Sequence, residues 1–305
     1  MDPTLPRPPS PWIAVFLGLI CNGLGHVYSR RIALGLGIFG AWLLLGVAWA
    51  FGLRGGLRPA LAGLITMLLF GLVQAVHAGV AARRSRDLPR RWLSRPVGLT
   101  VLFLAATGVN WAWRPLMRAA VVQTWVMPSG GMLPTLEIGD YFVSVPGMRI
   151  DRGAIVLYQH EGGGRSESPY VHRVVAIAGD TVEVRDGRLV LNGAAVPGEE
   201  LSGNCTYFTR FDNEWRGEPC RARTETIGEV TYRILCAPDR PCGDVPFQRV
   251  PPGHVFLLGD HRDNAADSRV FGPVRERAIL GRARWALFSW GPEGLRNERS
   301  GIELR

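Results

Sequence analysis

The distribution of apolar residues is the feature that most limits how this chain can fold. Three stretches contain no Asp, Glu, Lys or Arg: residues 32–53, 59–82 and 96–113. Each is long enough to cross a hydrocarbon core of ~30 Å as a helix that rises ~1.5 Å per residue. Residues 11–28 are a weaker candidate, because Asn22, His26 and three glycines interrupt them. The sequence predicts a helical membrane anchor with three or four spans over residues 1–113.

Arginines set the expected orientation of this anchor. The net charge is +9 and the chain has no lysine, so arginine carries all of the basic charge. Residues 83–95 hold six arginines against the single acid Asp87. Loops rich in Arg stay on the cytoplasmic side, so residues 96–113 should lead the chain outward. Because the arginines flank apolar spans, we expect the basic charge to face a lipid bilayer and not a nucleic acid.

Residues 114–305 change to a pattern of short strands and turns. The clearest strand signal is 181–192, where two alternating runs meet at Asp186-Gly187, a pair typical of a type I′ hairpin turn. Further strands are expected at 140–145, 154–158, 170–178, 230–236, 255–258 and 282–288. No helical period of useful length appears. We therefore expect a mostly β domain outside the membrane.

Four of the five cysteines lie in this second domain: Cys205, Cys220, Cys236 and Cys242. Four cysteines in a domain outside the cytosol indicate two disulfides. The sequence alone allows three pairings, and we favour the one that joins nearest neighbours. Zinc binding is the poorer alternative, because the spacings include no C-x-x-C pair.

Five segments of the chain resemble the motifs of type I signal peptidases, in the order in which that family has them. They are 127–140 (MPSGGMLPTLEIGD), 152–156 (RGAIV), 170–174 (YVHRV), 225–233 (ETIGEVTYR) and 259–269 (GDHRDNAADSR). The resemblance covers about residues 113–291 and does not extend to the earlier apolar spans. By these motifs the chain is identified as similar to the signal peptidase I family.

The resemblance implies a fold, a function and a location. The fold would be a coiled β sheet or barrel with an inserted β subdomain at about 180–250, carried on the multi-span helical anchor. The family is made of membrane serine endopeptidases that remove signal peptides from exported preproteins, with no metal or cofactor. The implied location is the bacterial cytoplasmic (inner) membrane, with the second domain on the periplasmic or outer side. The implied partners are signal peptides, the bilayer, and another peptidase or the secretion machinery.

The catalytic positions of the family are altered in this chain. In the family a serine attacks the scissile carbonyl, a neutral lysine removes the serine proton, and a second serine helps to hold the oxyanion. The nucleophile position is Gly131, and the base position is His172, as in relatives that use histidine. Ser129 stands at the oxyanion side. The serine that supports the base is replaced by Ala265.

These replacements leave several interpretations open. The chain is either a pseudo-peptidase, which binds signal peptides or a partner peptidase, or an enzyme that uses Ser129 with His172. Two further alternatives are a water activated by His172, and a Gly131 that replaces a native serine. A last possibility is a domain kept only as an assembly surface. An extended segment would displace Ser129 from position 131 by roughly 6–7 Å, which argues against a simple exchange of nucleophile.

Two further groups of residues are carried over from the family. The first aligns with residues that line the pockets for the cleavage site: Trp125, Met127, Leu136, Leu157, Tyr170 and Val171. The second is a charge-paired scaffold that holds residues 259–269 (the late motif) against the strand that carries His172 (the base strand). Its members are Arg173, Asp260, Asp263, Asp267 and Arg269, with Ala265 among them. By the resemblance, Asp260 pairs with Arg173. We expect His261, which replaces a family asparagine, to be exposed.

Overall fold

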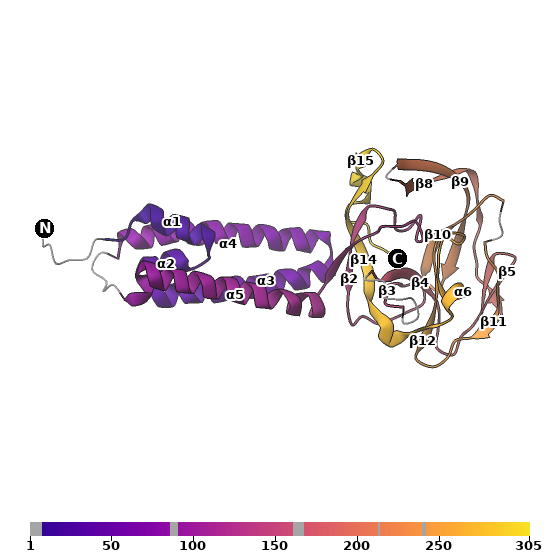
Figure 1. Cartoon of the computed structure of the whole chain (residues 1–305), viewed down its shortest axis with the longest axis horizontal. Coiled ribbons are helices and arrows are strands. Elements are labelled where there is room, and N and C mark those ends of the chain that lie inside the picture. Colours follow the sequence, from indigo (N-terminus) through magenta and orange to yellow (C-terminus); the bar gives the residue numbers. More distant parts are fainter. Residues whose placement is uncertain (1–7, 86–90, 161–167, 213, 240–241) are drawn as a thin grey trace, which may run out of the picture. The chain divides into compact units, whose positions relative to one another are not determined.

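A computed structural model describes residues 8–85, 91–160, 168–212, 214–239 and 242–305. The chain divides into two compact units, Met1–Val121 and Val122–Arg305. The first unit is helical and the second is made almost entirely of β strands (Figure 1).

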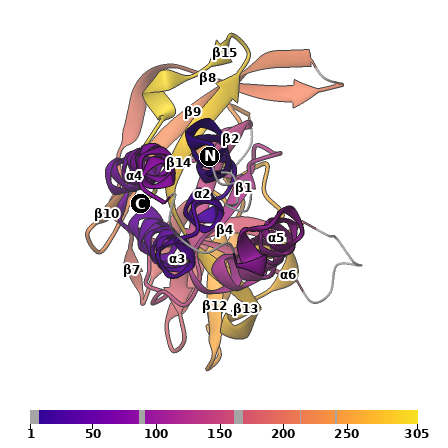
Figure 2. The ribbon, with the colours of Figure 1, turned by 90° about the vertical axis from the view of Figure 1, so that its left-hand side faces the viewer.

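The first unit contains five α-helices and a short 3-10 helix among its described residues, and Figure 2 shows several of these helices end-on. They are α1 (Pro11–Ile20), α2 (Leu24–Tyr28), α3 (Ile32–Gly55), α4 (Leu57–Arg83), η1 (Trp92–Ser94) and α5 (Pro96–Ala120). Within the described residues, α3 and α4 are long and apolar enough to cross a membrane. The predicted span at 96–113 lies in α5, whose shorter apolar part is Pro96–Ala112.

The weak candidate at 11–28 is not one continuous helix. Helix α1 has only ten residues, and the chain breaks before α2, where Gly23 has a φ of 90°. A Cβ on Gly23 would lie 2.0 Å from the Gly35 carbonyl oxygen, and one on Gly25 would lie 2.1 Å from the Ala14 oxygen. Only glycine allows these close approaches, so the glycines that weakened this stretch as a span instead let α2 pack against α1 and α3.

The second unit is built on one eight-stranded sheet of antiparallel pairs, with strand order β1-β2-β14-β3-β4-β12-β13 and β15 added to β14. Its strands are β1 (Gln123–Val126), β2 (Asp140–Val145), β3 (Ile155–Tyr158), β4 (Tyr170–Ile177), β12 (His254–Leu258), β13 (Val274–Arg275), β14 (Ile279–Gly291) and β15 (Gly294–Leu295). Strand β14 pairs with β3 through its first residues and with β2 through its later ones. Both pairings contain register shifts. These irregularities curl the sheet.

Between β4 and β12 the chain forms two smaller sheets, with strand orders β11-β5-β6-β7 and β10-β9-β8. Their strands are β5 (Thr181–Arg185), β6 (Arg188–Leu191), β7 (Ala194–Ala195), β8 (Glu200–Phe211), β9 (Glu214–Ile227), β10 (Val230–Cys236) and β11 (Val245–Arg249). This excursion from the main sheet comprises the residues between β4 and β12. A core cluster joins it to the main sheet, because Val182 and Ile234 pack with Val175 and Phe256. The excursion therefore shares a core with the strands that flank it.

Most expected strands are present near their predicted bounds. The predicted turn also holds, since Asp186 and Gly187 both have positive φ between β5 and β6. The long hairpin of β8 and β9 was not predicted. Exposed residues dominate β8, so it lacks the apolar alternation by which a strand is detected. The helical content of the described part of this unit is limited to α6 (Ser268–Phe271) and two short 3-10 turns, η2 (Glu276–Ala278) and η3 (Asn297–Arg299).

Two disulfides close loops in the excursion, Cys205–Cys220 and Cys236–Cys242. This is the nearest-neighbour pairing favoured from the sequence. The first bridge joins directly paired residues of β8 and β9, and the second joins the end of β10 to the segment before β11. Cys21 in the helical unit is the free cysteine of the chain.

Candidate active site

The segment that resembles the nucleophile motif, residues 127–140, is a closed loop between β1 and β2, which we call the nucleophile loop. Its ends are tied together, because the Met127 N–H donates to the Asp140 carbonyl at 2.8 Å and the Gly139 N–H donates to Met127 at 2.9 Å. Inside the loop the chain turns, with hydrogen bonds from Leu133 N–H to Gly130 and from Leu136 N–H to Met132. The loop after Ser129 is therefore not extended, and the separation estimated for an extended chain does not apply.

The C-terminal segment clamps the far end of this loop. The Arg299 guanidinium donates to the Thr135 carbonyl at 2.9 Å and pairs with Glu137 at 2.8 Å. Arg296 also pairs with Glu137 and donates to the Ile138 carbonyl at 2.7 Å. Charge-assisted bonds of this kind are stronger than neutral ones, so the loop is held rigidly beside the sheet.

Three of the predicted catalytic positions converge on Gly259. A Cβ placed on Gly259 would lie 2.2 Å from the Ala265 Cβ, 2.6 Å from the Gly131 carbonyl oxygen and 3.5 Å from Cδ2 of His172. Gly131 and Ala265 also face each other, since a Cβ on Gly131 would lie 3.8 Å from that of Ala265. The structure therefore brings Gly131, His172 and Ala265 together around one point.

His172, which occupies the predicted base position, is buried. Its side chain is 4% exposed on β4, and its Nδ1 lies 2.9 Å from the Tyr158 hydroxyl on β3. Burial lowers the pKa of His172 to about 4, against the opposing attraction of Asp267. Burial also raises the pKa of Tyr158, so its phenol keeps its proton. The imidazole is uncharged at neutral pH, with Tyr158 as its hydrogen-bond partner among the described residues.

Tyr158 was not singled out from the sequence. Strands β3 and β4 pair Val156 with His172, and Tyr158 lies two residues further along, on the same face of β3 as Val156. Only this register places its hydroxyl on the imidazole. The sequence contains the tyrosine but does not specify the register.

Arg173 and Asp260 form the ion pair that the resemblance implied. Both side chains are buried, and the guanidinium donates to both carboxylate oxygens at 2.8 and 2.6 Å. Arg173 also donates to the Gly153 carbonyl at 2.7 Å, and Thr135 donates to Asp260. The pair thus connects the base strand, the nucleophile loop and the late motif.

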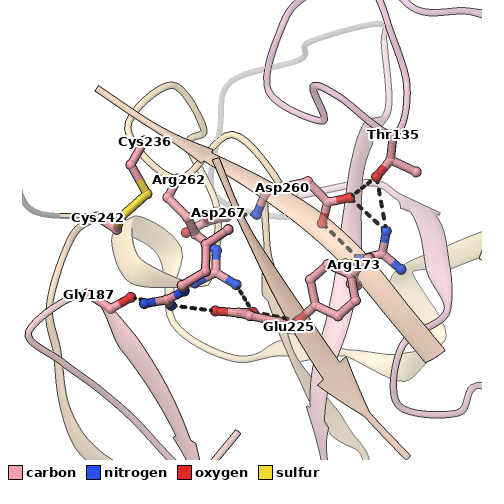
Figure 3. A network of polar contacts seen from close by, with 12 residues as sticks. Thr135, Arg173, Gly187, Glu225, Cys236, Cys242, Asp260, Arg262 and Asp267 are labelled. Carbon is pink, nitrogen blue, oxygen red and sulfur yellow. Dashed lines mark hydrogen bonds and ion pairs between the residues drawn. A yellow bond between two sulfur atoms is a disulfide. The ribbon is translucent and has the colours of Figure 1, made fainter. Parts of the chain in front are cut away.

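A second buried network, not expected from the sequence, lies beside the first (Figure 3). Glu225 on β9 is paired with Arg262 of the late motif and with Arg223 at 3.0 Å, and it accepts a hydrogen bond from Tyr232 at 2.7 Å. The arginines hold the pKa of Glu225 below its usual value although burial opposes this. The Arg173 guanidinium lies 4.0 Å from the centre of the Tyr232 ring and so joins the two networks. Glu225 and Arg262 both lie in segments that resemble family motifs. This was the sequence signal that could have indicated the second network.

The remaining acids of the late motif hold its backbone. Asp267 accepts from the Gly259 N–H at 2.8 Å, caps α6 by accepting from the Arg269 N–H at 3.0 Å, and pairs with the Arg269 side chain. Asp263 accepts from the Ala237 N–H at 2.8 Å. These contacts fix the loop that carries Gly259 and Ala265.

The expectation that His261 is exposed is wrong. Its side chain is 2% exposed, its Nδ1 lies 3.2 Å from the Gly130 carbonyl, and its N–H donates to Gly131 at 3.1 Å. It also packs edge-on against Tyr207 of β8. The late loop folds against the nucleophile loop and covers this residue, a contact that the sequence does not reveal. Ser129 is exposed, and its hydroxyl has no hydrogen bond to the described residues.

Five of the six expected pocket residues belong to one apolar cluster. Met127, Leu136 and Leu157 are buried in it, while Trp125 and Val171 pack against it with part of their surface exposed. Tyr170 packs against the adjacent cluster and is also partly exposed. The buried members therefore lie beneath Trp125 and Val171, whereas Tyr170 belongs to the cluster that contains Val156 and Tyr158.

Comparisons with known proteins identify the family of the chain. The sequence profile of the family described as "Signal peptidase, peptidase S26" matches residues 98–288. The chain belongs to this signal peptidase family. Its second unit therefore has the signal peptidase fold, a mostly β domain with a curled sheet, and the convergence on Gly259 assembles positions of the family's motifs.

The relatives of the chain include signal peptidases of bacteria. Signal peptidase I of Pseudomonas aeruginosa is 30% identical over 206 residues, which cover 57% of this chain and 68% of that protein. A probable signal peptidase I-1 of Synechocystis is 29% identical over 192 residues, covering 59% and 79%. A crystal structure of a signal peptidase I from Enterococcus faecalis aligns with 44% of this chain and 97% of its own, at 22% identity and a TM-score of 0.28.

Proposed function

We propose that this chain is a membrane-anchored signal peptidase homologue that binds the signal peptides of exported preproteins without cleaving them. One observation carries the proposal. At the point where His172 and Ala265 converge, the loop presents Gly131, which has no side chain. Covalent catalysis needs a nucleophile within hydrogen-bond reach of its base, and glycine supplies none.

Neither backbone strain nor lack of space requires the glycine. Gly131 is not among the residues with positive φ. A Cβ at this position would lie 3.4 Å from the Asn264 carbonyl oxygen and 3.8 Å from Ala265, which are ordinary contacts. A Cβ therefore has room at this position, so we propose that Gly131 changes the chemistry of the site and not its frame.

The features that favour peptide binding remain. The partly exposed Trp125 and Val171 pack on buried apolar residues, where the small residues before a cleavage site would pack. An extended peptide could add to this region as a strand. The buried ion pairs keep the surrounding loops in place.

The first unit and the disulfides support a proposal for the location of the chain. We propose that α3, α4 and α5 span the cytoplasmic membrane of a bacterium, with residues 83–95 on the cytoplasmic side. The second unit then lies outside, where an oxidising environment maintains both disulfides. Its partners there would be signal peptides, the bilayer, and another peptidase or the secretion machinery.

The test compares binding and cleavage by the full-length chain in detergent micelles. A fluorescent preprotein peptide should bind to the unmodified protein and remain intact. Gly131→Ser should gain cleavage, and adding His172→Ala should abolish it. The proposal is excluded if the unmodified protein cleaves the peptide, or if it does not bind it.

A peptidase that uses Ser129 is the second candidate. It is favoured by the exposure of Ser129, by the absence of a hydrogen-bond partner for its hydroxyl among the described residues, and by the turn that follows it. Under this function the unmodified protein cleaves the peptide, and Ser129→Ala removes the activity.

A further inference from the structure

The segment that follows η3, residues 300–305, lies along an edge of the main sheet, and we call it the tail. The Leu304 N–H of the tail donates to the Arg284 carbonyl of β14 at 2.7 Å. Strand β2 pairs with β14 through residues 282–289, so the tail lies on the opposite edge of β14. Strand β3 pairs with that edge through residues 279–282. The tail therefore continues along β14 from the point where β3 ends.

A single side chain of the tail is buried. Leu304 is 2% exposed, whereas its neighbours Glu303 and Arg305 are exposed and Ile302 is 39% exposed. Leu304 belongs to the apolar cluster that also contains three of the expected pocket residues, Met127 among them. The other buried members of this cluster lie in the main sheet or in the nucleophile loop. Leu304 thus enters the cluster from a segment that otherwise lies at the surface.

The tail is held in place on both sides of this leucine. Arg299, which directly precedes the tail, donates to the Thr135 carbonyl of the nucleophile loop at 2.9 Å. Glu303, next to Leu304, pairs with Arg284 at 3.4 Å. Because these contacts and the backbone hydrogen bond fix the chain around Leu304, a bound peptide would not displace its side chain without breaking them.

Leu304 occupies volume beneath the proposed peptide site. Trp125 and Val171, on which the small side chains of a peptide would pack, contact the same cluster. Protein interiors are close-packed, so the space that Leu304 fills is not available to a side chain that enters from this surface. When a buried leucine is shortened, its surroundings relax only in part and an apolar cavity remains. Such a cavity can take up an apolar group.

We infer that Leu304 determines the size of the peptide side chains that this site accepts. By filling the cluster beneath Trp125 and Val171, it restricts binding to peptides with small residues before the cleavage position. The inference rests on the proposed function, because it names the residue that gives the same peptide site its selectivity. In this role Leu304 excludes larger side chains and takes no part in chemistry.

Three synthetic peptides test this with the full-length protein in micelles. All carry a signal sequence; the first has an Ala-x-Ala site, and the other two have leucine in place of the first or the second alanine. The unmodified protein should bind the alanine peptide at least about tenfold more tightly than either leucine peptide, because an apolar site without room rejects extra methylene groups by such factors. Fluorescence anisotropy would give the dissociation constants.

Leu304→Ala should bind one of the leucine peptides about tenfold more tightly than the unmodified protein does, with its affinity for the alanine peptide unchanged. Leu304→Met nearly conserves the side-chain volume and should retain the original selectivity. The matched control is Ile302→Ala, which shortens an exposed side chain of the same tail and should also retain it.

Leu304→Val leaves a smaller cavity and keeps the inference testable if Leu304→Ala does not fold. It should improve the binding of a leucine peptide by about threefold. The selectivity of the unmodified protein in Leu304→Val would overturn the inference and leave the proposed function intact.

Three further outcomes would also overturn the inference. Equal binding of all three peptides by the unmodified protein would show that the site does not select for size. An equal gain for the alanine and leucine peptides in Leu304→Ala would show that Leu304 competes with the peptide and does not limit its side chains. If the unmodified protein bound none of the peptides, the proposed function would fail together with the inference.

Discussion

Under the proposed function, Gly131 is the residue at which this chain departs from the chemistry of its family, and His172 determines what can be restored there. The Cδ2 atom of His172 faces Gly259 and the Gly131 carbonyl, and Cδ2 is bonded to Nε2. Nδ1 faces Tyr158 on the other side. A hydroxyl at position 131 would therefore need to be deprotonated by Nε2.

The first prediction concerns the pH dependence of cleavage by Gly131→Ser. His172 must be neutral to accept a proton, and burial lowers its pKa from the ordinary 6.5 to about 4. Activity should therefore be lost on acidification with a midpoint near 4, and it should be nearly constant from pH 6 to 8. The measurement is kcat/KM against pH. A midpoint near 6.5 would show that His172 is solvated in the active variant.

The second prediction concerns the tautomer of His172. For Nε2 to act as the base, Nδ1 must carry the hydrogen and donate it to the Tyr158 hydroxyl. We expect the ¹⁵N spectrum of histidine-labelled protein, assigned with His172→Gln, to show the Nδ1–H form.

Removal of the tyrosine hydroxyl provides the control for this assignment. Tyr158→Phe keeps the ring and removes the acceptor, so the population should move toward the Nε2–H form. In the Gly131→Ser background the same change should lower kcat more than it raises KM. The same Nε2–H tautomer in both proteins would contradict a positioning role for Tyr158.

Among the elements, strand β9 contributes more to the site than its surface pattern indicates. Through Glu225 it joins the excursion to Arg262 in the loop that presents Gly259 and Ala265. Removal of one member of a buried ion pair leaves the others uncompensated in a medium of low dielectric constant.

The third prediction follows from this network. Glu225→Gln should lower the free energy of unfolding of the second unit by roughly 3–5 kcal/mol, because Arg223 and Arg262 lose their counter-charge. Glu229→Gln, an exposed acid in the turn after β9, should change it by less than about 0.5 kcal/mol. Urea unfolding of the full chain in detergent, followed by near-UV circular dichroism, would compare the two. Equal midpoints would contradict the role assigned to Glu225.

At the scale of the whole molecule, the proposed arrangement is a helical unit in the membrane and a β unit outside it. The arginine-rich stretch 83–95 and the two disulfides are independent indications of the same orientation. The charge bias favours a cytoplasmic position for residues 83–95, and the disulfides need an oxidising compartment.

The fourth prediction tests this orientation. A reporter enzyme that is active only outside the cytoplasm should be active when fused after residue 150. It should be inactive when fused within residues 83–95. Reduction-sensitive migration of the cell-made protein on gels, lost in Cys205→Ala with Cys220→Ala, would give a second readout. Reporter activity at both positions would contradict the proposed topology.

The sequence by itself determined the properties that depend on local pattern. Uncharged runs predicted α3 and α4, and alternation with turn residues predicted most strands and the Asp186-Gly187 hairpin. The motifs identified the family and the Arg173–Asp260 pair. They also predict that Gly131, His172 and Ala265 occupy altered catalytic positions. These properties follow from residue type and spacing along the chain, which can be observed directly.

The tertiary structure decided the properties that depend on register and on contacts between distant segments. It placed Tyr158 on His172, buried His261 against the Gly131 loop, joined Glu225 to Arg262 and packed Cys205 and Tyr207 of β8 against Leu133. A strand that slips by one residue turns every side chain to the other face, and the sequence carries little information on such a shift where the residues are polar. Packing of the loops and strands selects one register, and with it the neighbours of the site.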